Sequence, residues 1–170
     1  QLLEEHAFLR ELAGREIPVV APLELSKGRT LGEVEELGIF YTVFPRARGR
    51  VRDEIDEADA AQLGRLLARV HSVGASLPVR HRLRMDVATW GRANLRFLMD
   101  AGVVPAAFRD RYASVVERVL DRAEPWFEDA DSQPIHGDCH LGNVLWGSEG
   151  AMLVDFDDMV VGPPVQDLWL

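Results

Sequence analysis

The sequence predicts an α+β fold, in which helices and strands occupy separate stretches of the chain. Helical spacing of apolar residues is found in 2–14 and in a block from 55 to about 120. Runs rich in β-branched and aromatic residues lie before and after that block, with no strand–helix–strand alternation. A chain of 170 residues with 47% hydrophobic residues is long enough to bury a core.

The first predicted element is an amphipathic helix. Leu2, Phe8 and Leu12 recur at helical spacing, and Gly14 stands where a C-terminal cap is expected. The next stretches, "IPVVAPLEL" and "LGIFYTVF", are punctuated by proline and glycine. They predict extended chain and strands up to Phe44.

The middle of the chain predicts three further helices. The first begins near Ile55 and ends at Gly74, and another is suggested around Trp90. The last follows Pro105, which suits a first helical turn. We expect its apolar face to pack on the helix that ends at Gly74 or on a similar element; this face consists of Phe108, Tyr112, Val115, Val116, Val119 and Leu120.

A β-hairpin is predicted near the C-terminus, where "NVLW" and "MLVDF" flank the turn sequence "GSEG". Antiparallel pairing about this turn brings together positions whose numbers sum to about 297 or 298. Asn143 then lies beside Val154 or Asp155. An amide oxygen and a carboxylate at this place are ligands that suit Mg²⁺, which takes its other ligands from water and substrate phosphates.

The stretch "HGDCHLGNVLW" adds a second carboxylate to this arrangement. Asp138 lies five residues before Asn143, on the loop that enters the hairpin. A carboxylate there could accept a proton from an attacking hydroxyl close to a metal-bound phosphate. These groups together are typical of phosphoryl transfer.

The motifs also resemble those of a known family. The Asp-x4-Asn spacing, followed by an aspartate after a strand, resembles the catalytic and metal-binding loops of the protein-kinase-like fold. The strings "HGDCHLGNVLW", "LVDFDD" and "GPPVQDLW" are similar to those of the aminoglycoside phosphotransferase and choline kinase family. Within it they look most like the stress response kinase A group of bacterial serine/threonine protein kinases. The resemblance implies an ATP- and Mg²⁺-dependent kinase.

The resemblance also implies roles for individual residues. Asp138 would be the catalytic proton acceptor, and Asn143 and the catalytic Asp155 would bind Mg²⁺. His136 would brace the catalytic loop, and Asp167 would tie the loop backbone to a following helix.

Two features of a small lobe are implied as well. Glu5 would match the helix glutamate that pairs with an ATP-orienting lysine, and the backbone of Phe44, Pro45 and Arg46 would meet the adenine. Residues 1–45 would then be the end of the small lobe with its hinge, and 46–170 most of the large lobe.

The sequence departs from a complete kinase in one respect. The sequence has no glycine-rich loop and no strand lysine before Glu5. Its single lysine, Lys27, comes after Glu5 and so cannot be that strand lysine. The chain also begins and stops within apolar patterns, so we expect a truncated piece of a larger protein. This piece alone should phosphorylate nothing at a measurable rate.

Other functions remain open at this point. The acceptor could be a small-molecule hydroxyl, as in aminoglycoside, choline or homoserine kinases, or the chain could be an inactive nucleotide-binding or interaction module. A zinc-dependent hydrolase would use His136, Asp138, Cys139 and His140, but the sequence has no distant His or Cys pair to complete a tetrahedral site. Asp157 and Asp158 could extend the metal site or form a solvated turn.

Composition limits the partners and the compartment. A net charge of -9 repels polyanions unless basic residues cluster, and the basic run "RARGRVR" at 46–52 is interpreted as a solvated edge, so a nucleic-acid partner is not expected. The apolar runs are too short for a membrane span, and a lone cysteine, Cys139, fits a reducing cytoplasm. We expect a monomer, with Cys139 filling space and His71 as a satisfied interior histidine.

Overall fold

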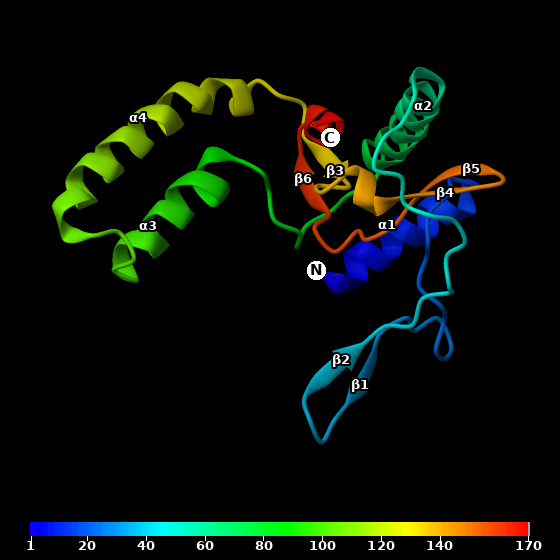
Figure 1. Cartoon of the computed structure of the whole chain (residues 1–170). Helices are drawn as coiled ribbons and strands as arrows, with labels where there is room; N and C mark the ends of the chain where they lie inside the picture. The colour runs from blue at the N-terminus through cyan, green and yellow to red at the C-terminus, as the bar shows by residue number, and fades with distance from the viewer. Residues whose placement is uncertain (170) are drawn as a thin grey trace.

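The computed structural model describes residues 1–169 and contains helices and strands in separate stretches of the chain (Figure 1). The predicted α+β class is confirmed. Among the described residues, no helix is both long enough and apolar enough to cross a membrane. The elements, in chain order, are α1 (Leu2–Gly14), β1 (Gly32–Val34), β2 (Ile39–Tyr41), α2 (Glu57–Gly74), the π-helix η1 (Val87–Arg92), α3 (Ala93–Asp100), the 3₁₀ turn η2 (Ala106–Phe108), α4 (Arg109–Glu128), β3 (Gln133–Ile135), the 3₁₀ turn η3 (Leu141–Asn143), β4 (Val144–Gly147), β5 (Gly150–Leu153), β6 (Val160–Gly162) and the 3₁₀ helix η4 (Pro164–Leu168).

The strands form three small antiparallel pairs: β1 with β2, β3 with β6, and β4 with β5. The main core lies where α1 and α2 pack with the β4–β5 hairpin. Most of the apolar stripe predicted for each of α1 and α2 is buried there, with Phe8 and Leu12 from α1 beside Leu63 and Val70 from α2, whereas Leu2 at the start of α1 is exposed. The start of α2 is capped by Asp56, whose carboxylate accepts from the amide of Asp59 at 2.8 Å.

The segment 17–25, predicted as extended chain and strand, forms no named strand. It makes one isolated parallel bridge, Val19 to Leu153, next to a hydrogen bond from Leu153 N to Pro18 O of 3.0 Å. Pro18 and Pro22 lack an amide hydrogen, so they cannot donate the backbone hydrogen bonds that a longer strand pairing would need. Strand β2 does lie within "LGIFYTVF", and its partner β1 was not anticipated.

The elements η1, α3 and α4 form a helical arm that extends away from the main core (Figure 1). The expectation that α4 packs on α2 is wrong: α4 packs against η1 and α3, and contains no buried residue. Leu120 of α4 lies so close to Gly91 that an added Cβ would come within 2.3 Å of it. An apolar stripe specifies which face of a helix is apolar but not which element covers it.

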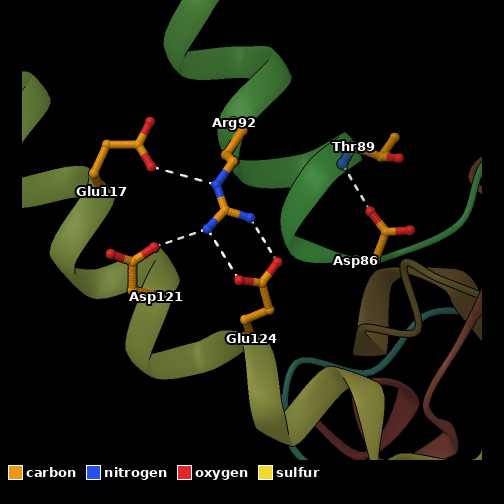
Figure 2. A network of polar contacts seen from close by, with 6 residues as sticks. All are labelled: Asp86, Thr89, Arg92, Glu117, Asp121 and Glu124. Carbon is orange, nitrogen blue, oxygen red and sulfur yellow. Dashed lines mark hydrogen bonds and ion pairs between the residues drawn. The ribbon is translucent and has the colours of Figure 1, made fainter.

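Arg92 connects η1 to α4 through three carboxylates (Figure 2). It contacts Glu117 at 3.4 Å, Asp121 at 2.8 Å and Glu124 at 2.6 Å. These residues lie three and four positions apart, on one side of α4. The arm is therefore held by a charged contact as well as by packing at Gly91.

Candidate active site

The β4–β5 hairpin has the register expected from its turn. Val144 pairs with Leu153 and Gly147 with Gly150, so paired numbers sum to 297. The amide of Val154 donates to the carbonyl of Asn143 at 3.0 Å. Asn143 therefore lies opposite Val154, one residue from Asp155, as one of the two predicted registers requires.

Asn143 is linked directly to Asp138. Its side-chain Nδ2 donates to the Asp138 carbonyl at 2.9 Å and approaches the carboxylate Oδ2 at 3.3 Å. Asn143 is 8% exposed, whereas half of the Asp138 side chain is open to solvent. Because Nδ2 is engaged, the amide oxygen of Asn143 is the atom left to bind a cation.

Asp155 follows β5 at the edge of a cavity of about 260 Å³. It is exposed, and its backbone has a φ of 61°, a left-handed conformation that is uncommon for a residue other than glycine. Glu5 and Asp157 lie on the same cavity, and its apolar lining includes Val20 and Phe44. The cavity thus combines an apolar wall with three carboxylates from α1 and the segment after β5.

The three predicted hinge residues are divided between two cavities. Phe44 and Ala47 line the cavity of Asp155, whereas Pro45 and Arg46 line a neighbouring one of about 470 Å³ that extends to the β4–β5 turn. The structure therefore brings Phe44 together with Glu5 and Asp155, but not Pro45 or Arg46.

Glu5 is a buried acid at this cavity, only 2% exposed. Burial raises its pKa to about 7, and the charges of Asp157 and Asp155 act in the same direction. Arg82 opposes this shift from 3.5 Å, but Glu5 Oε2 has no hydrogen-bond partner among the described residues. The carboxylate is therefore only partly compensated by its surroundings.

His136 braces the loop that carries Asp138. Its Nε2 donates to the carbonyl of Val154 at 2.9 Å, and its Nδ1 accepts from the amide of Asp138 at 3.3 Å. The ring also lies 4.3 Å from that of Phe156. Burial lowers the pKa of His136, which favours the neutral ring that these two hydrogen bonds require. The imidazole thus connects Asp138 to both neighbours of Asp155.

Asp167, in η4, anchors the same loop from the other side. Its carboxylate accepts from the amides of His136 at 2.9 Å and Gly137 at 2.8 Å. It also contacts His71 Nε2 of α2 at 2.8 Å. The carboxylate is fully buried, so its charge is stabilised by these three donors. His71 is satisfied, as expected, although its partner was not foreseen.

Gly137 allows the loop to approach the segment after Asp155. Its φ is 89°, and a Cβ at this position would lie 2.2 Å from the carbonyl oxygen of Asp158. A residue with a side chain would meet both a backbone clash and an unfavourable φ.

The described residues give the zinc alternative no support. Over residues 1–169, no three His, Cys, Asp or Glu side chains are grouped so that they could hold a metal ion. His140 Nδ1 accepts from the amide of Gly142 at 3.0 Å and so caps η3. Cys139 is buried, and burial raises the pKa of its thiol to about 12.

An oxygen-liganded cation fits the same region better. The amide oxygen of Asn143 and the exposed carboxylate of Asp155 are hard donors. The cavity that Asp155 lines leaves room for water and phosphate ligands. The partly compensated Glu5 beside Asp155 and Asp157 also favours added positive charge at this cavity. Oxygen donors of this kind suit a hard cation such as Mg²⁺ better than Zn²⁺.

Two residues next to Glu5, one in the chain and one in space, had no signal in the sequence. His6 is buried in α1, where it hydrogen-bonds to Thr30 at 2.7 Å and Thr42 at 3.2 Å. Arg82 contacts Glu5 and the segment that follows Asp155. In both cases the partners are at least 24 positions away in the chain, so a local pattern could not reveal them.

Comparison with known proteins identifies the family of this chain. All 170 residues match the family described as "Phosphotransferase enzyme family" (APH). Stress response kinase A of Escherichia coli (strain K12) is 35% identical over 173 residues, which cover 100% of this chain and 51% of that protein. "Serine/threonine protein kinase RdoA" of Salmonella typhimurium (strain LT2) is 36% identical with the same coverage. The chain thus spans about half the length of these curated relatives.

Solved structures agree on the fold. The amicoumacin kinase hAmiN, in complex with AMP-PNP, Ca²⁺ and amicoumacin, superposes with a TM-score of 0.73 at 20% identity, covering 98% of this chain and 51% of that one. The AMP complex of spectinomycin phosphotransferase superposes with a TM-score of 0.60 at 17% identity, covering 95% and 57%. The observed architecture is a truncated kinase-like fold, and the chain belongs to the phosphotransferase enzyme family.

Proposed function

We propose that this chain is the nucleotide- and metal-binding part of an ATP- and Mg²⁺-dependent serine/threonine protein kinase. One observation carries the proposal: the hairpin register brings Asn143 to within one residue of Asp155, while Asn143 Nδ2 holds Asp138. A metal-binding amide, a metal-binding carboxylate and a proton-accepting carboxylate are the groups that phosphoryl transfer uses.

The proposed roles follow from the contacts. Asn143 and Asp155 would hold Mg²⁺, which would supply positive charge to the phosphates of ATP. Asp138 orients the acceptor hydroxyl and takes its proton, because its carboxylate is exposed yet its backbone is held by Asn143. His136 and Asp167 keep this loop in place through backbone hydrogen bonds.

The nucleotide would occupy the cavity between α1 and Asp155. Glu5 would contribute to nucleotide binding from α1, and Phe44 would contact the adenine from its apolar wall. In this proposal residues 1–45 are the end of a small lobe and residues 46–170 most of a large lobe. Pro45 and Arg46 would belong to the hinge without lining the nucleotide cavity.

The proposed phosphate acceptor is inferred from the relatives that share the higher sequence identity with this chain. Stress response kinase A and RdoA, at 35% and 36% identity over the whole chain, favour a protein hydroxyl. The structures of antibiotic kinases are only 14–20% identical, so a small-molecule hydroxyl is the second candidate.

The lone buried Cys139 suits a cytoplasmic enzyme. A monomer is also part of the proposal.

A different alternative is an inactive nucleotide-binding module. Within residues 1–169 no lysine pairs with Glu5, and its Oε2 lacks a hydrogen-bond partner. We therefore expect the 170-residue chain by itself to transfer no phosphate at a measurable rate. Transfer by a longer natural protein that contains it would exclude the inactive module, and robust turnover by the 170 residues would contradict this expectation.

Nucleotide binding and phosphate transfer test the proposed roles separately. Calorimetric titration with AMP-PNP, with and without Mg²⁺, should show tighter binding with the metal. Asp155→Ala should abolish this difference, whereas Asp138→Asn should retain it and, in the full-length protein, lose transfer to a generic protein substrate. Asp129→Asn, an exposed position on the arm, is the charge-matched control. Equal Mg²⁺-dependent affinity of the wild type and Asp155→Ala would refute the metal assignment.

A further inference from the structure

Arg82 lies between α2 and η1 and contacts the turn that follows Asp155. Its Nε donates to the carbonyl of Met159 at 2.6 Å, and its Nη2 to those of Phe156 at 3.2 Å and Asp157. The side chain is only 7% exposed. Three backbone carbonyls of one turn therefore point at a single guanidinium that is largely shielded from water.

The same guanidinium also faces α1. Its Nη1 lies 3.5 Å from Oε2 of Glu5, the carboxylate at the nucleotide cavity. Arg82 is the cation that opposes the burial of Glu5. It therefore bridges the two sides of the cavity, with Glu5 on one and the backbone after Asp155 on the other.

The backbone of Arg82 is fixed by the residue next to Glu5. The carboxylate of Glu4 accepts from the amides of Arg80 at 2.7 Å, His81 at 2.8 Å and Arg82 at 2.9 Å. The main chain of this segment is thus attached to the first turn of α1. Movement of α1 would be transmitted through Arg82 to the turn of residues 156–159.

We propose that Arg82 is a positioning residue that holds the turn of residues 156–159 against α1, and so sets where Asp155 stands relative to Glu5. For its effect on metal and nucleotide, this inference rests on the proposed function. The planar guanidinium can donate in several fixed directions at once. A lysine retains the positive charge near Glu5 but cannot donate several hydrogen bonds in the fixed directions of a guanidinium. The contributions of charge and of hydrogen-bond geometry can therefore be tested separately.

Three variants of the chain test the proposal. Arg82→Met removes both the positive charge and the hydrogen-bond geometry of the guanidinium, and Arg82→Lys removes that geometry alone. Arg80→Met removes the same charge two positions away, from an exposed residue, and is the control. The first measurement is hydrogen exchange at the Met159 amide, which donates to the Phe156 carbonyl at 2.9 Å inside the turn. The second is affinity for AMP-PNP with and without Mg²⁺.

Both Arg82 variants should speed exchange at Met159 more than at the amides of α2. They should also weaken Mg²⁺-dependent binding by about tenfold, the lower end of the effect of residues that orient metal ligands. Binding without Mg²⁺ should be unchanged, and Arg80→Met should match the wild type in every measurement.

Two results would overturn the proposal. One is an Arg82→Lys variant that equals the wild type in exchange and affinity, because charge alone would then suffice. The other is a uniform rise of exchange across α2 and the turn, the mark of general destabilisation. If the wild type itself shows no Mg²⁺-dependent binding, the proposed function fails, while selective exchange at Met159 still supports Arg82 as the residue that holds the turn.

Discussion

His71 and Asp167, ninety-six positions apart in the chain, are joined by a 2.8 Å contact between Nε2 and Oδ2. The same carboxylate binds the amides of His136 and Gly137. One buried side chain therefore connects α2, the loop of Asp138 and η4. Since the carboxylate is fully buried, it needs these donors as hydrogen-bond partners, and the donors in turn need the carboxylate.

Asp167→Ala should destabilise the fold strongly, because it leaves the buried amides of His136 and Gly137 without an acceptor. We expect a loss of about 2–5 kcal/mol in the free energy of unfolding, measured by urea denaturation. His71→Ala should lower the free energy of unfolding by less, because the side chain of His71 is 15% exposed and the hydrogen bonds from both backbone amides to Asp167 remain. A larger loss for His71→Ala than for Asp167→Ala would contradict this ranking.

The buried acid Glu5 should make stability depend on pH. Its pKa is raised from 4.5 to about 7 in the folded state, so the folded chain holds the proton more tightly than the unfolded chain. This group therefore lowers the free energy of unfolding as pH rises from about 4.5 through 7.

Glu5→Gln removes that titration. The stability of the variant relative to the wild type should increase between pH 4.5 and 8, by up to about 3 kcal/mol. Urea denaturation at several pH values measures the difference. A difference that stays constant with pH would show that Glu5 has an ordinary pKa.

Gly137 should not tolerate a side chain. Gly137→Ala places a Cβ 2.2 Å from the Asp158 carbonyl at a φ of 89°, so we expect a loss of roughly 2 kcal/mol or more in unfolding free energy. Gly64→Ala is the matched control, because this exposed position in α2 has nothing within 4 Å of an added Cβ. It should stabilise the chain by about 1 kcal/mol. Equal effects of the two substitutions would contradict the close approach at Gly137.

Cys139 should be chemically inert in the folded chain. Its thiol is buried, and its pKa is raised to about 12, because burial disfavours the thiolate that reacts. Labelling with a disulfide reagent at pH 8 should be slow without denaturant and complete within minutes in urea. Fast labelling of the folded chain would mean that the thiol is accessible and ionised.

The arm should detach more readily when the contacts of Arg92 are weakened. Hydrogen bonds from Arg92 lower the pKa of Glu124 below its ordinary 4.5. This interaction therefore contributes above pH 4.5 and is lost as pH falls through the lowered pKa.

Arg92→Gln, high salt and acid should each speed amide exchange in α4 more than in α2, because exposed ion pairs are screened by salt. Arg118→Gln on the same helix is a control for charge, since its only hydrogen bond goes to the carbonyl of Ser114 within the described chain. Equal α4 exchange in the two variants would indicate that packing at Gly91 alone holds the arm.

Local patterns predicted the hairpin well. The turn at residues 147–150 and the alternation of the two strands limit the pairing to two registers, and the structure has the one that pairs Val144 with Leu153. The likeness of the motifs placed the chain in the phosphotransferase family, and the family match over 170 residues confirms it. The roles of Asp138, Asn143 and Asp155 remain predictions that the binding and transfer experiments test.

The arm was predicted only in part. The helical spacing correctly indicated a helix after Pro105, but α4 packs on η1 and α3 instead of α2. Likewise, valine and leucine content suggested a strand at 17–25, where only one bridge forms. Side-chain preference favours a local conformation, but pairing requires a partner with free backbone groups in the right place.

The sequence by itself determined the main helices, the position of the hairpin and the family, because each depends on residues that lie close together in the chain or on a contiguous motif. The structure chose between the two hairpin registers that the sequence allowed. Only the tertiary structure decided that Asp167 binds His71, that His6 meets Thr30 and that Arg82 joins Glu5 to the turn after Asp155. These contacts depend on the direction of side chains brought together from distant segments, and periodicity carries no information about that direction.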